Sequence, residues 1–511
     1  MPDTIPDLLS AAAERDPDGV WLRTDDGTQT FAGASGQVAA AAGRLRGLGI
    51  TTGDLVVVIT RTTPPYLLTW LALTSLGAIA VTTDPKGTVE ELTGLVGQAQ
   101  PSMVVTDAEL RSLAQEAIGR AGSKARLTDV AELVEDWTAT VNGADLPHAV
   151  EPDDVAVLIP TSGTTGRSKL VMQTHRAYAW AGEGFPYWME LGSDDRLMTS
   201  LPLFHINAPA YSVMGSLAAG AGLVLLPRFS ASGFLDSARR HGATEFNAIG
   251  AMLEILMRQP VSPDDADTPL RLCYTGPSPA KEWQEAFEER FGLRVVCGYA
   301  MSESPYGLIW RHGTRPFGTL GSVRQHPRLG VVNEARVIGD DGQDVSDGET
   351  GELWLRNPVV TPGYWGMPDV TAETITDGWL HTGDLVTKNA GDTYTFVSRR
   401  KEVLRRRGQN LSPLEVEEAV ASHPDVLEVA VVAVPSELTE DEVKAFVVMA
   451  PDSAPDFAAL RAWAGERLSA FKVPRYWQQV DSLPRTPTQR VAKHRLPSGH
   501  PEDEYDAETS R

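Results

Sequence analysis

One short segment of the chain combines hydroxyl, glycine and lysine residues in a pattern that suits phosphate binding. It follows an apolar run, Val155 to Ile159, that predicts a buried strand, and it reads Thr161-Ser162-Gly163-Thr164-Thr165-Gly166-Arg167-Ser168-Lys169. Glycines let the backbone turn tightly and approach a ligand closely. Hydroxyl and backbone N–H groups can surround phosphate oxygens, and Lys169 adds a point charge. We therefore expect a phosphate-binding loop here.

The Walker A pattern, G-x-x-x-x-G-K-[ST], does not describe this loop. If Gly163 began that pattern and Lys169 supplied its lysine, Ser168 would replace the second glycine. Leu170 would then stand where the pattern requires a hydroxyl side chain. The loop is therefore a phosphate-binding loop of another kind.

Helix-like and strand-like segments alternate around this loop. Helical patterns cover Phe31 to Leu48 and Ser232 to His241. Short apolar runs predict strands at Asp54 to Ile59, Ile79 to Thr82, Met103 to Thr106, Val155 to Ile159 and Gly222 to Leu226. Alternation of this kind is typical of α/β layers with mainly parallel sheets.

The later part of the chain has a different texture. Residues 318–397 contain short β-rich pieces and frequent turns, which predict a small β-barrel or mixed sheet. A boundary is expected near residues 398–401, and Ser412-Pro413-Leu414-Glu415 then predicts a helix start with a serine cap. Strands at 429–434 and 445–449 and a helix at 456–469 complete a small α+β domain, and the acidic tail from Ser498 is expected to be disordered.

The phosphate loop closely resembles the signature of the adenylate-forming superfamily, which includes acyl-CoA synthetases, adenylation domains of peptide synthetases and luciferases. The family form is roughly [ST]-S-G-[ST]-T-G-x-P-K, and this chain departs only at Ser168, where proline is usual. Three further segments resemble family motifs in the family's order: Gly298-Tyr299-Ala300-Met301-Ser302-Glu303, Gly378-Trp379-Leu380-His381-Thr382-Gly383-Asp384-Leu385 and Ser398-Arg399-Arg400-Lys401-Glu402. The resemblance spans roughly Phe31 to Leu496. The texture around His205 and Phe246 is most similar to the branch of carnitine/crotonobetaine-type CoA ligases.

The resemblance implies a fold and a domain organisation. An α/β N-terminal domain of two layered αβα sheets plus a small β-barrel would cover residues 1–398, with its β-rich part at about 318–397. Residues 399–402 would form a hinge that turns about Lys401. Residues 403–497 would form a mobile α+β C-terminal domain, and residues 498–511 a disordered acidic tail.

The resemblance also implies a role for each matching residue. Tyr299 would stack on adenine, Ser302 would lie by the phosphates, Asp384 would accept hydrogen bonds from the ribose hydroxyls, and Glu303 would hold Mg²⁺. One carboxylate suffices for Mg²⁺, because this cation keeps several waters when it bridges phosphates. The full set assigned to ATP is Thr161, Ser162, Gly163, Thr164, Thr165, Gly166, Lys169, Gly276, Pro277, Tyr299, Ser302, Asp384 and Arg399. Gly351 to Leu353 and Gly363-Tyr364-Trp365 also fit a family segment and are interpreted as structural.

The carboxylic acid substrate is expected beside Phe204-His205, since in the family an aromatic–histidine pair lines the carboxylate pocket. An isolated histidine would more simply be a core residue with satisfied hydrogen bonds. The other residues assigned to this pocket are Asn207, Asn247, Gly250 and Ser304. The segments that contain them are mostly small, apolar or neutral, which favours an acid with a hydrophobic or neutral tail.

The C-terminal catalytic lysine of the family has no direct counterpart. The family pattern is P-x-T-x-x-G-K-[VI], whereas this chain has Arg490 at the lysine position, Gln489 at the glycine position and Lys493 three residues later. Arginine is a fixed cation, but its planar fork is not interchangeable with an ammonium. Lys493 is favoured slightly over Arg490 as the cation that stabilises the α-phosphate.

These assignments imply attack of a carboxylate on the α-phosphorus of ATP, release of pyrophosphate, and transfer of the acyl group to CoA. Arg405, Arg407 and Gly408 stand where family CoA ligases present basic residues, although such a run often forms only a solvated charged face. We do not expect a carrier-protein domain to follow, which counts against a multidomain peptide-synthetase module. Transfer to an amine or to a separate carrier protein stays open, and Arg490 leaves open an inactive nucleotide-binding paralogue.

Composition excludes several other classes of function. The 511-residue chain is too long for one core, and its net charge of −23 argues against non-specific nucleic-acid binding. The two cysteines, Cys273 and Cys297, imply neither a disulfide framework nor a cysteine metal site. The N-terminus lacks a signal peptide, and Tyr66 to Val81 predicts a buried helix that runs into a strand rather than a membrane span. We expect a cytoplasmic enzyme without integral membrane association; a homodimer would be common for such a protein.

Overall fold

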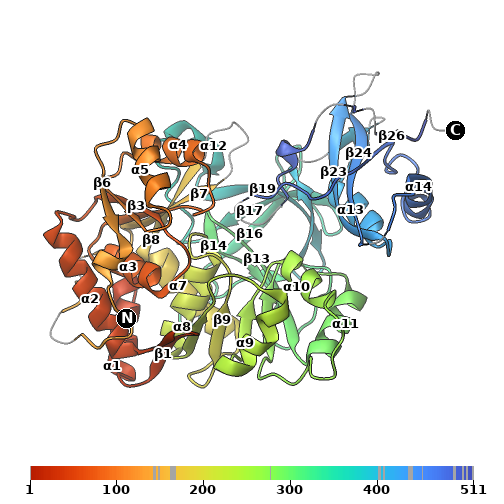
Figure 1. Ribbon diagram of the computed structural model, residues 1–511. Coiled ribbons are helices and arrows are strands. Elements are labelled where there is room, and N and C mark those ends of the chain that lie inside the picture. Colours follow the sequence, from red (N-terminus) through yellow and green to blue (C-terminus); the bar gives the residue numbers. More distant parts are fainter. Residues whose placement is uncertain are drawn as a thin grey trace. The chain divides into compact units, whose positions relative to one another are not determined.

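The computed structural model describes residues 2–141, 145–147, 150–161, 169–276, 278–400, 404–406, 409–435, 441–451, 453–486, 491–497, 500–501 and 504–508. The chain divides into two compact units (Figure 1). The first comprises Met1–Ala335, Trp354–His381 and Gly391–Tyr394, and the second comprises Arg336–Leu353, Thr382–Ala390 and Thr395–Arg511. The predicted domain boundaries, the hinge included, stay predictions.

A six-stranded sheet in the first unit carries the segments on either side of the phosphate loop. Its strands follow the order β6-β5-β3-β4-β7-β8, with parallel pairing throughout except for the antiparallel pair β7 and β8. The strands are β3 (Leu55–Ile59), β4 (Ile79–Thr82), β5 (Met103–Thr106), β6 (Arg126–Asp129), β7 (Val155–Thr161) and β8 (Lys169–Thr174), and the intervening helices are α3 (Pro64–Ser75), α4 (Val89–Ala99), α5 (Arg111–Arg120) and α6 (Val130–Leu133). The predicted mainly parallel α/β layer is confirmed.

Helix α3, which contains most of the longest apolar stretch of the chain, is buried in the core. It begins after Thr63, whose hydroxyl accepts a hydrogen bond from the Tyr66 amide, and every residue from Tyr66 to Ser75 is buried. A helix that is apolar on all sides is stable only when surrounded by other elements. Within the described part of the chain, no helix has the length and apolar character needed to cross a membrane.

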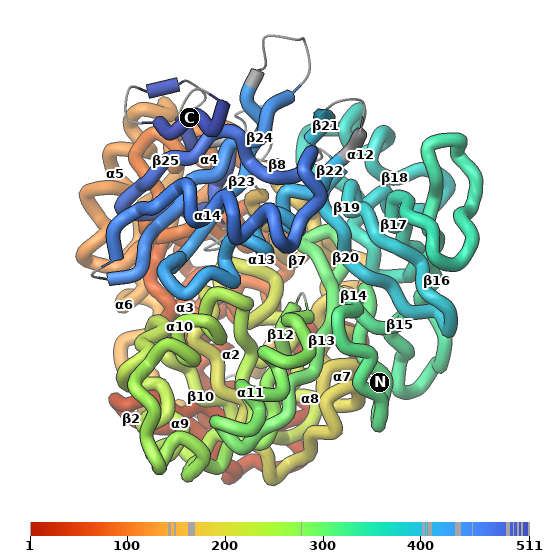
Figure 2. The backbone as a smooth tube through the Cα atoms, turned by 90° about the vertical axis from the view of Figure 1, so that its right-hand side faces the viewer, coloured from red at the N-terminus to blue at the C-terminus, as the bar shows by residue number. Residues whose placement is uncertain are grey.

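The second large sheet of the first unit has nine strands in the order β15-β14-β13-β12-β11-β9-β10-β1-β2. From β10 through β11 and β12 to β13 the chain moves steadily toward one edge, and right-handed crossovers then place the connecting helices on one face. Figure 2 shows these helices, α9, α10 and α11, side by side. The strands are β1 (Val20–Thr24), β2 (Gly27–Thr30), β9 (Arg196–Thr199), β10 (Gly222–Leu225), β11 (Glu245–Asn247), β12 (Leu272–Thr275), β13 (Arg294–Met301), β14 (Ser304–Ile309) and β15 (Ser322–Val323); the helices are α1 (Ile5–Arg15), α2 (Phe31–Gly47), α7 (His175–Met189), the π-helix η1 (Ala208–Val213), α8 (Met214–Ala219), α9 (Phe234–His241), α10 (Gly250–Met257) and α11 (Lys281–Phe291).

A five-stranded sheet occupies the region predicted as a β-barrel or mixed sheet. Strands β16-β17-β19-β18 form a path in which β20 pairs with β19. The elements are β16 (Glu334–Ile338), β17 (Thr350–Arg356), α12 (Pro368–Thr374), β18 (Ile375–Thr376), β19 (Trp379–Asn389) and β20 (Thr393–Arg399). The described strands follow an open path, in which β18 and β19 pair antiparallel.

The C-terminal part of the second unit is the predicted small α+β fold. A four-stranded sheet in the order β23-β24-β25-β26 and the hairpin β21–β22 pack with two helices around a separate apolar core. The elements are β21 (Leu404–Arg406), β22 (Gln409–Leu411), α13 (Pro413–Ala421), β23 (Val426–Pro435), β24 (Asp441–Met449), α14 (Phe457–Gly465), β25 (Tyr476–Gln479) and β26 (Tyr505–Asp506).

Two local expectations in this unit are corrected. The Ser412 hydroxyl makes no capping hydrogen bond to α13 and instead donates to the Val397 carbonyl at 2.6 Å. The tail is not disordered at Tyr505–Asp506, which forms β26. The Asp506 carboxylate accepts two hydrogen bonds from Arg475, each 3.0 Å, and such a bidentate pair holds this short strand on β25.

Glu245, the first residue of β11, is a fully buried carboxyl in the nine-stranded sheet. Burial, reinforced by the Asp195 carboxylate and opposed by Arg271, raises the pKa of Glu245 well above its usual range. Because the pKa of Glu245 is higher in the folded state than in the unfolded state, the free energy of unfolding depends on pH. It is at its full value below the pKa of the unfolded state, near 4.5, and falls as the pH rises above that value. The loss approaches about 1.4 kcal/mol per pH unit while the carboxyl stays protonated in the fold.

We expect Glu245→Gln to raise the midpoint of thermal unfolding at pH 8 and to leave it nearly unchanged at pH 4. Glutamine keeps the shape of the protonated carboxyl and removes the cost of a buried charge. The exposed Glu282 on α11 provides the matched control, Glu282→Gln, for which no such pH-dependent gain is expected. An equal gain at both pH values would show that the charge of Glu245 is not the cause.

Candidate active site

The β7–β8 hairpin presents the two ends of the phosphate loop. Thr161 ends β7, Lys169 begins β8, and the two residues are directly paired, with the Thr161 hydroxyl 3.4 Å from the Lys169 carbonyl oxygen. The predicted loop residues between them, Ser162, Gly163, Thr164, Thr165 and Gly166, lie outside the described residues. The hairpin thus brings the Thr161 hydroxyl and the Lys169 side chain to one end of the six-stranded sheet.

Lys169, Tyr364 and Glu303 form a connected group in the first unit. The Lys169 ammonium lies 4.7 Å from the centre of the Tyr364 ring, a cation–π contact. The Tyr364 hydroxyl donates a hydrogen bond of 2.9 Å to Oε1 of Glu303, whose residue is only 8% exposed. Burial and the neighbouring Glu303 carboxylate both raise the pKa of Tyr364, so this hydroxyl stays a donor. The group joins the phosphate hairpin to the predicted magnesium ligand.

Backbone hydrogen bonds hold Glu303 in this position. The Thr361 amide donates to the Glu303 carbonyl at 2.7 Å, and the Thr361 hydroxyl donates to the Met172 carbonyl on β8 at 2.5 Å. The Gln173 side chain donates to the Ser302 carbonyl. The turn Ser302–Glu303 between β13 and β14 is therefore fixed against β8 and the 361–364 segment.

Tyr364 contacts two residues of the candidate site, although the sequence gives no signal for these contacts. Its segment was interpreted as structural, and its backbone does serve that role, because Met172 and Gly363 are hydrogen-bonded through their backbones at 3.0 Å. Only the fold shows that the phenol also contacts Glu303, 61 residues away in the sequence.

The predicted adenine segments lie at the ends of two neighbouring parallel strands. Gly276 follows β12, and a Cβ atom there would lie 2.2 Å from the Gly298 carbonyl oxygen on β13. Such a distance excludes any side chain, so the pattern Gly276…Gly298 reflects a close approach of two backbones. Tyr299 follows directly and is half-buried, and Pro277 lies outside the described residues.

The predicted acid pocket contains a short polar network. The Asn247 side chain is 1% exposed and donates to Oδ1 of Asn207 at 2.8 Å and to the Ser212 hydroxyl at 3.2 Å. The His205 ring lies 4.3 Å from that of Phe204, measured between ring centres. The carbonyl of Phe204 accepts a hydrogen bond of 2.9 Å from Thr82 at the end of β4. Two sheets therefore position the residues predicted to hold the acid, with Gly250 at the start of α10 and Ser304 at the start of β14.

A buried cation stands behind this network. Arg324 is fully buried, and its guanidinium donates to the Tyr211 hydroxyl at 2.8 Å, to the Tyr274 hydroxyl, and to the carbonyls of Pro305 and Leu308 at 3.0 and 3.1 Å. Every acceptor that this guanidinium has among the described residues is a neutral oxygen. Its charge is therefore not neutralised by a contacting carboxylate, and burial weakens solvent screening. Tyr211 lies on η1, the helix that follows Asn207.

The second unit brings together two other residues predicted to bind the nucleotide. Asp384 on β19 is 2% exposed, and its Oδ1 lies 3.1 Å from Nε of Arg399 at the end of β20. The Gly383 amide donates to Glu352 at 2.9 Å, and Arg400 pairs with the other oxygen of Glu352 at 2.9 Å. The Asp384 carboxylate can accept hydrogen bonds from a sugar diol while the Arg399 guanidinium contacts a phosphate.

Lys493 also has a carboxylate partner within the second unit. Its ammonium lies 2.8 Å from Oε1 of Glu417 on α13, with both side chains mostly buried. The same Glu417 oxygen accepts a hydrogen bond of 2.7 Å from the Val431 amide. Arg490, the predicted alternative to Lys493, lies outside the described residues. The same holds for the predicted hinge residue Lys401, for the predicted CoA-binding residues Arg407 and Gly408, and for the side chain of Arg405.

Arg406, at the centre of the basic run, is a structural residue. It is 5% exposed, forms a double ion pair with Glu442 on β24, and donates to the carbonyls of Phe471 and Val473 at 2.8 and 2.9 Å. One member of the basic run thus serves the core of the second unit rather than solvent.

Parallel α/β sheets and a hairpin whose connecting loop is rich in glycine and hydroxyl residues are typical of nucleotide-binding α/β enzymes. Residues 9–365 match the AMP-binding enzyme family and residues 415–490 match the AMP-binding enzyme C-terminal domain, so the chain belongs to that family. It is an adenylate-forming, ATP-binding ligase by this membership.

Named relatives and solved structures agree with this family. The crotonobetaine/carnitine–CoA ligase of Escherichia coli (strain K12 / DH10B) is 31% identical over 467 residues, which are 88% of this chain and 89% of the relative. The corresponding ligase of Salmonella paratyphi A is 29% identical over 91% of this chain and 92% of its own length. The o-succinylbenzoate CoA synthetase of Bacillus subtilis, solved with ATP and magnesium ion, superposes with a TM-score of 0.83 at 25% identity, covering 96% of this chain and 98% of that one.

Proposed function

We propose that the protein activates a carboxylic acid with ATP to an acyl-adenylate and then transfers the acyl group to CoA, which releases AMP. The observation that carries this proposal is the contact chain from Lys169 through Tyr364 to Glu303, because it connects a phosphate cation to a buried carboxylate. The relatives named as CoA ligases support CoA as the acceptor.

The first step is in-line attack of the carboxylate on the α-phosphorus, with pyrophosphate as the leaving group. Transfer of this kind needs positioning and charge neutralisation rather than covalent help from the protein. Thr161 and Lys169 hold the β- and γ-phosphates, Asp384 and Arg399 hold the ribose and phosphate, and His205 orients the acid. Glu303 would hold Mg²⁺, which neutralises charge on the phosphate oxygens when it is bound.

Glu303 has the chemistry that this cation requires. Mg²⁺ prefers oxygen ligands, keeps several waters, and is usually bound through one or two carboxylates together with substrate phosphates. Among the described residues no group of three or more histidine, cysteine, aspartate or glutamate side chains could hold a metal ion by itself. The Glu303 carboxylate, oriented by Tyr364, is therefore suited to a cation that arrives with ATP.

The buried charge of Arg324 limits the kind of acid. Its guanidinium touches Tyr211, on the helix that carries the predicted acid pocket, and no carboxylate contacts it among the described residues. Like charges brought together in a poorly solvated site cost several kcal/mol. Although the curated relatives are named for crotonobetaine and carnitine, we propose a neutral or anionic tail for the acid of this chain.

We expect AMP to accumulate only when ATP, Mg²⁺, CoA and an acid are all present, with neutral aliphatic or aryl acids and dicarboxylic acids at least tenfold better than betaines in kcat/KM. Quantifying AMP across such a panel, with and without CoA, checks both the requirement for CoA and the preference among acids. AMP release that requires an acid but not CoA would indicate that the acyl acceptor is an amine or a carrier protein rather than CoA. Absence of acid-dependent AMP despite ATP binding would mean an inactive paralogue, and a preference for betaines would remove the role given to Arg324.

A further inference from the structure

A polar hollow lies on the nine-stranded sheet, on strands that carry none of the residues assigned to ATP. It has a volume of about 210 Å³ and lies over β1, β9 and β10. That volume far exceeds the roughly 10–15 Å³ that one water requires, so the hollow can hold a molecule of several heavy atoms. Two arginines, Arg23 and Arg196, line it.

The strand register places both arginines on the same face of the sheet. Arg23 on β1 is paired with Val224 on β10, and Arg196 on β9 is paired with Gly222, two residues earlier on β10. Residues two apart on a strand point to the same face. Because Gly222 has no side chain, the space between the two arginines is left open, and the Arg196 side chain passes within 3.1 Å of the place a Cβ would take.

The Arg23 guanidinium has no acidic partner. Its Nε atom is buried without a hydrogen bond, and within the described residues no ion pair or side-chain hydrogen bond involves Arg23. Burial, and then the charge of Arg196, lower the pKa of Arg23. Leaving the buried Nε–H without an acceptor is costly, and an anion in the hollow would supply one.

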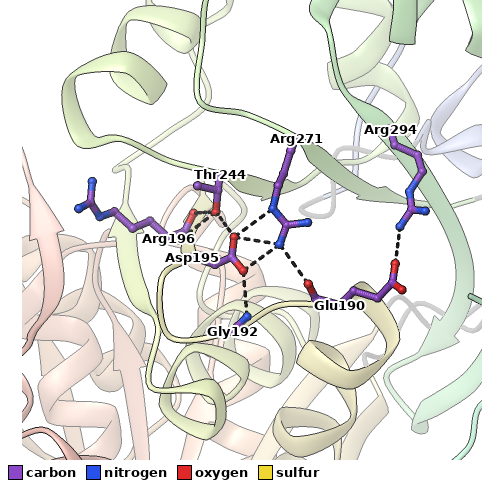
Figure 3. Close-up of polar contacts among 7 residues, drawn as sticks. All are labelled: Glu190, Gly192, Asp195, Arg196, Thr244, Arg271 and Arg294. Carbon is purple, nitrogen blue, oxygen red and sulfur yellow. Dashed lines mark hydrogen bonds and ion pairs between the residues drawn. The ribbon is translucent and has the colours of Figure 1, made fainter.

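Three carboxylates, those of Asp16, Asp194 and Asp195, also line the hollow. Asp195 accepts hydrogen bonds from Gly192, Thr244 and Arg271, as Figure 3 shows, and the Arg196 side chain points away from this cluster. Asp16 accepts from the Gly19 amide at 3.1 Å. Asp194 is exposed to solvent. Within the described part of the chain, none of these three carboxylates forms an ion pair with Arg23 or Arg196.

We propose that Arg23 and Arg196 form a binding site for a small oxyanion, with a phosphate or carboxylate group held between the two guanidinium groups. Arg196 keeps its position through a hydrogen bond of 3.2 Å to the His241 carbonyl, which leaves its other donors for the ligand. Guanidinium forks match the geometry of both oxyanions and give charge-assisted hydrogen bonds. This site is separate from the proposed ATP site and does not depend on the proposed reaction.

Calorimetric titration of the full chain with inorganic phosphate, and separately with malonate, at constant ionic strength tests the site. We expect Arg23→Gln to weaken the Arg23-dependent binding about tenfold, as loss of a charged hydrogen bond does. The control Arg46→Gln removes an equal charge from an exposed position on α2 and should bind as the wild type does. Stronger binding of phosphate than of malonate would identify the phosphate group as the preferred ligand, and the reverse would identify the carboxylate.

Two further readouts separate this site from the active site. Phosphate binding at the Thr161–Lys169 loop should be unchanged in Arg23→Gln. The adenylation rate of this variant should equal that of the wild type. Without phosphate, Arg23→Gln should unfold at the wild-type temperature or above it, because an unpartnered cation has been removed. Equal phosphate and malonate affinities in Arg23→Gln and wild type, or earlier unfolding of Arg23→Gln in the absence of anions, would overturn the proposal.

Discussion

Glu303→Gln should lower acid-dependent pyrophosphate release by about 10²–10³-fold, the usual loss when one preorganised electrostatic contact to a reacting group is removed. Glutamine keeps the shape and can still accept the hydrogen bond from Tyr364, so the fold around the β13–β14 turn should persist. What disappears is the negative charge that a phosphate-bound divalent cation needs. The rate should therefore recover in part as the Mg²⁺ concentration is raised.

Two controls give this result its meaning. Tyr364→Phe keeps the ring under Lys169 and removes only the hydroxyl, so it should reduce the rate less than Glu303→Gln does. Glu282→Gln, on the exposed face of α11, should have no effect on the rate. A Glu303→Gln protein with the full rate and an unchanged Mg²⁺ dependence would show that Glu303 is only structural.

Arg490→Ala should reduce acyl-adenylate formation by about a hundredfold or more, because a fixed cation at the α-phosphate stabilises charge that develops in the transition state. The sequence favoured Lys493 slightly over Arg490. The contact of 2.8 Å between Lys493 and Glu417 now favours Arg490, since the Lys493 ammonium already has a partner in its own unit. Pyrophosphate release without CoA isolates this step.

Lys493→Ala is the matched comparison. We expect it to lower the free energy of unfolding of the second unit by about 3 kcal/mol, because the mostly buried Glu417 carboxylate loses its ion-pair partner. Adenylation should stay within a few-fold of the wild type. If Lys493→Ala abolishes adenylation at unchanged stability while Arg490→Ala remains active, the two roles are exchanged.

The elements of the first unit could be predicted from the sequence because their signals are local. Strands β4 and β5 begin and end at the predicted residues, and α2 differs from its prediction by one residue. These segments are buried runs or clear helical patterns, so the period of the hydrophobic residues decides their structure. The start of α13 was also found at its proline, yet its cap was wrong, because Ser412 has a competing acceptor, the Val397 carbonyl, that local sequence does not reveal.

The sequence could nominate residues for the candidate site but could not predict the contacts between them. Motif spacing indicated Lys169 and Glu303, whereas the phenol that joins them comes from a segment 61 residues beyond Glu303. Arg324 shows the same limit. An arginine in a polar stretch is typical of a surface, and only the fold places it in a fully buried cage of aromatic rings and carbonyls. Burial of a charge depends on its partners, which lie far away in sequence.

Helix η1, a π-helix of six residues, has a consequence for how this enzyme can change over evolutionary time. Its last turn closes from the Met214 amide to the Pro209 carbonyl, one residue wider than an α-helical turn. Deleting a single residue from Ala208–Val213 would restore an α-helix and rotate the preceding residues by about 100° relative to α8. Asn207 would then no longer face Asn247, while the strands of both sheets would keep their register. A change in chain length by one residue, without any substitution, is thus enough to change which side chains the segment before η1 presents to the predicted acid pocket.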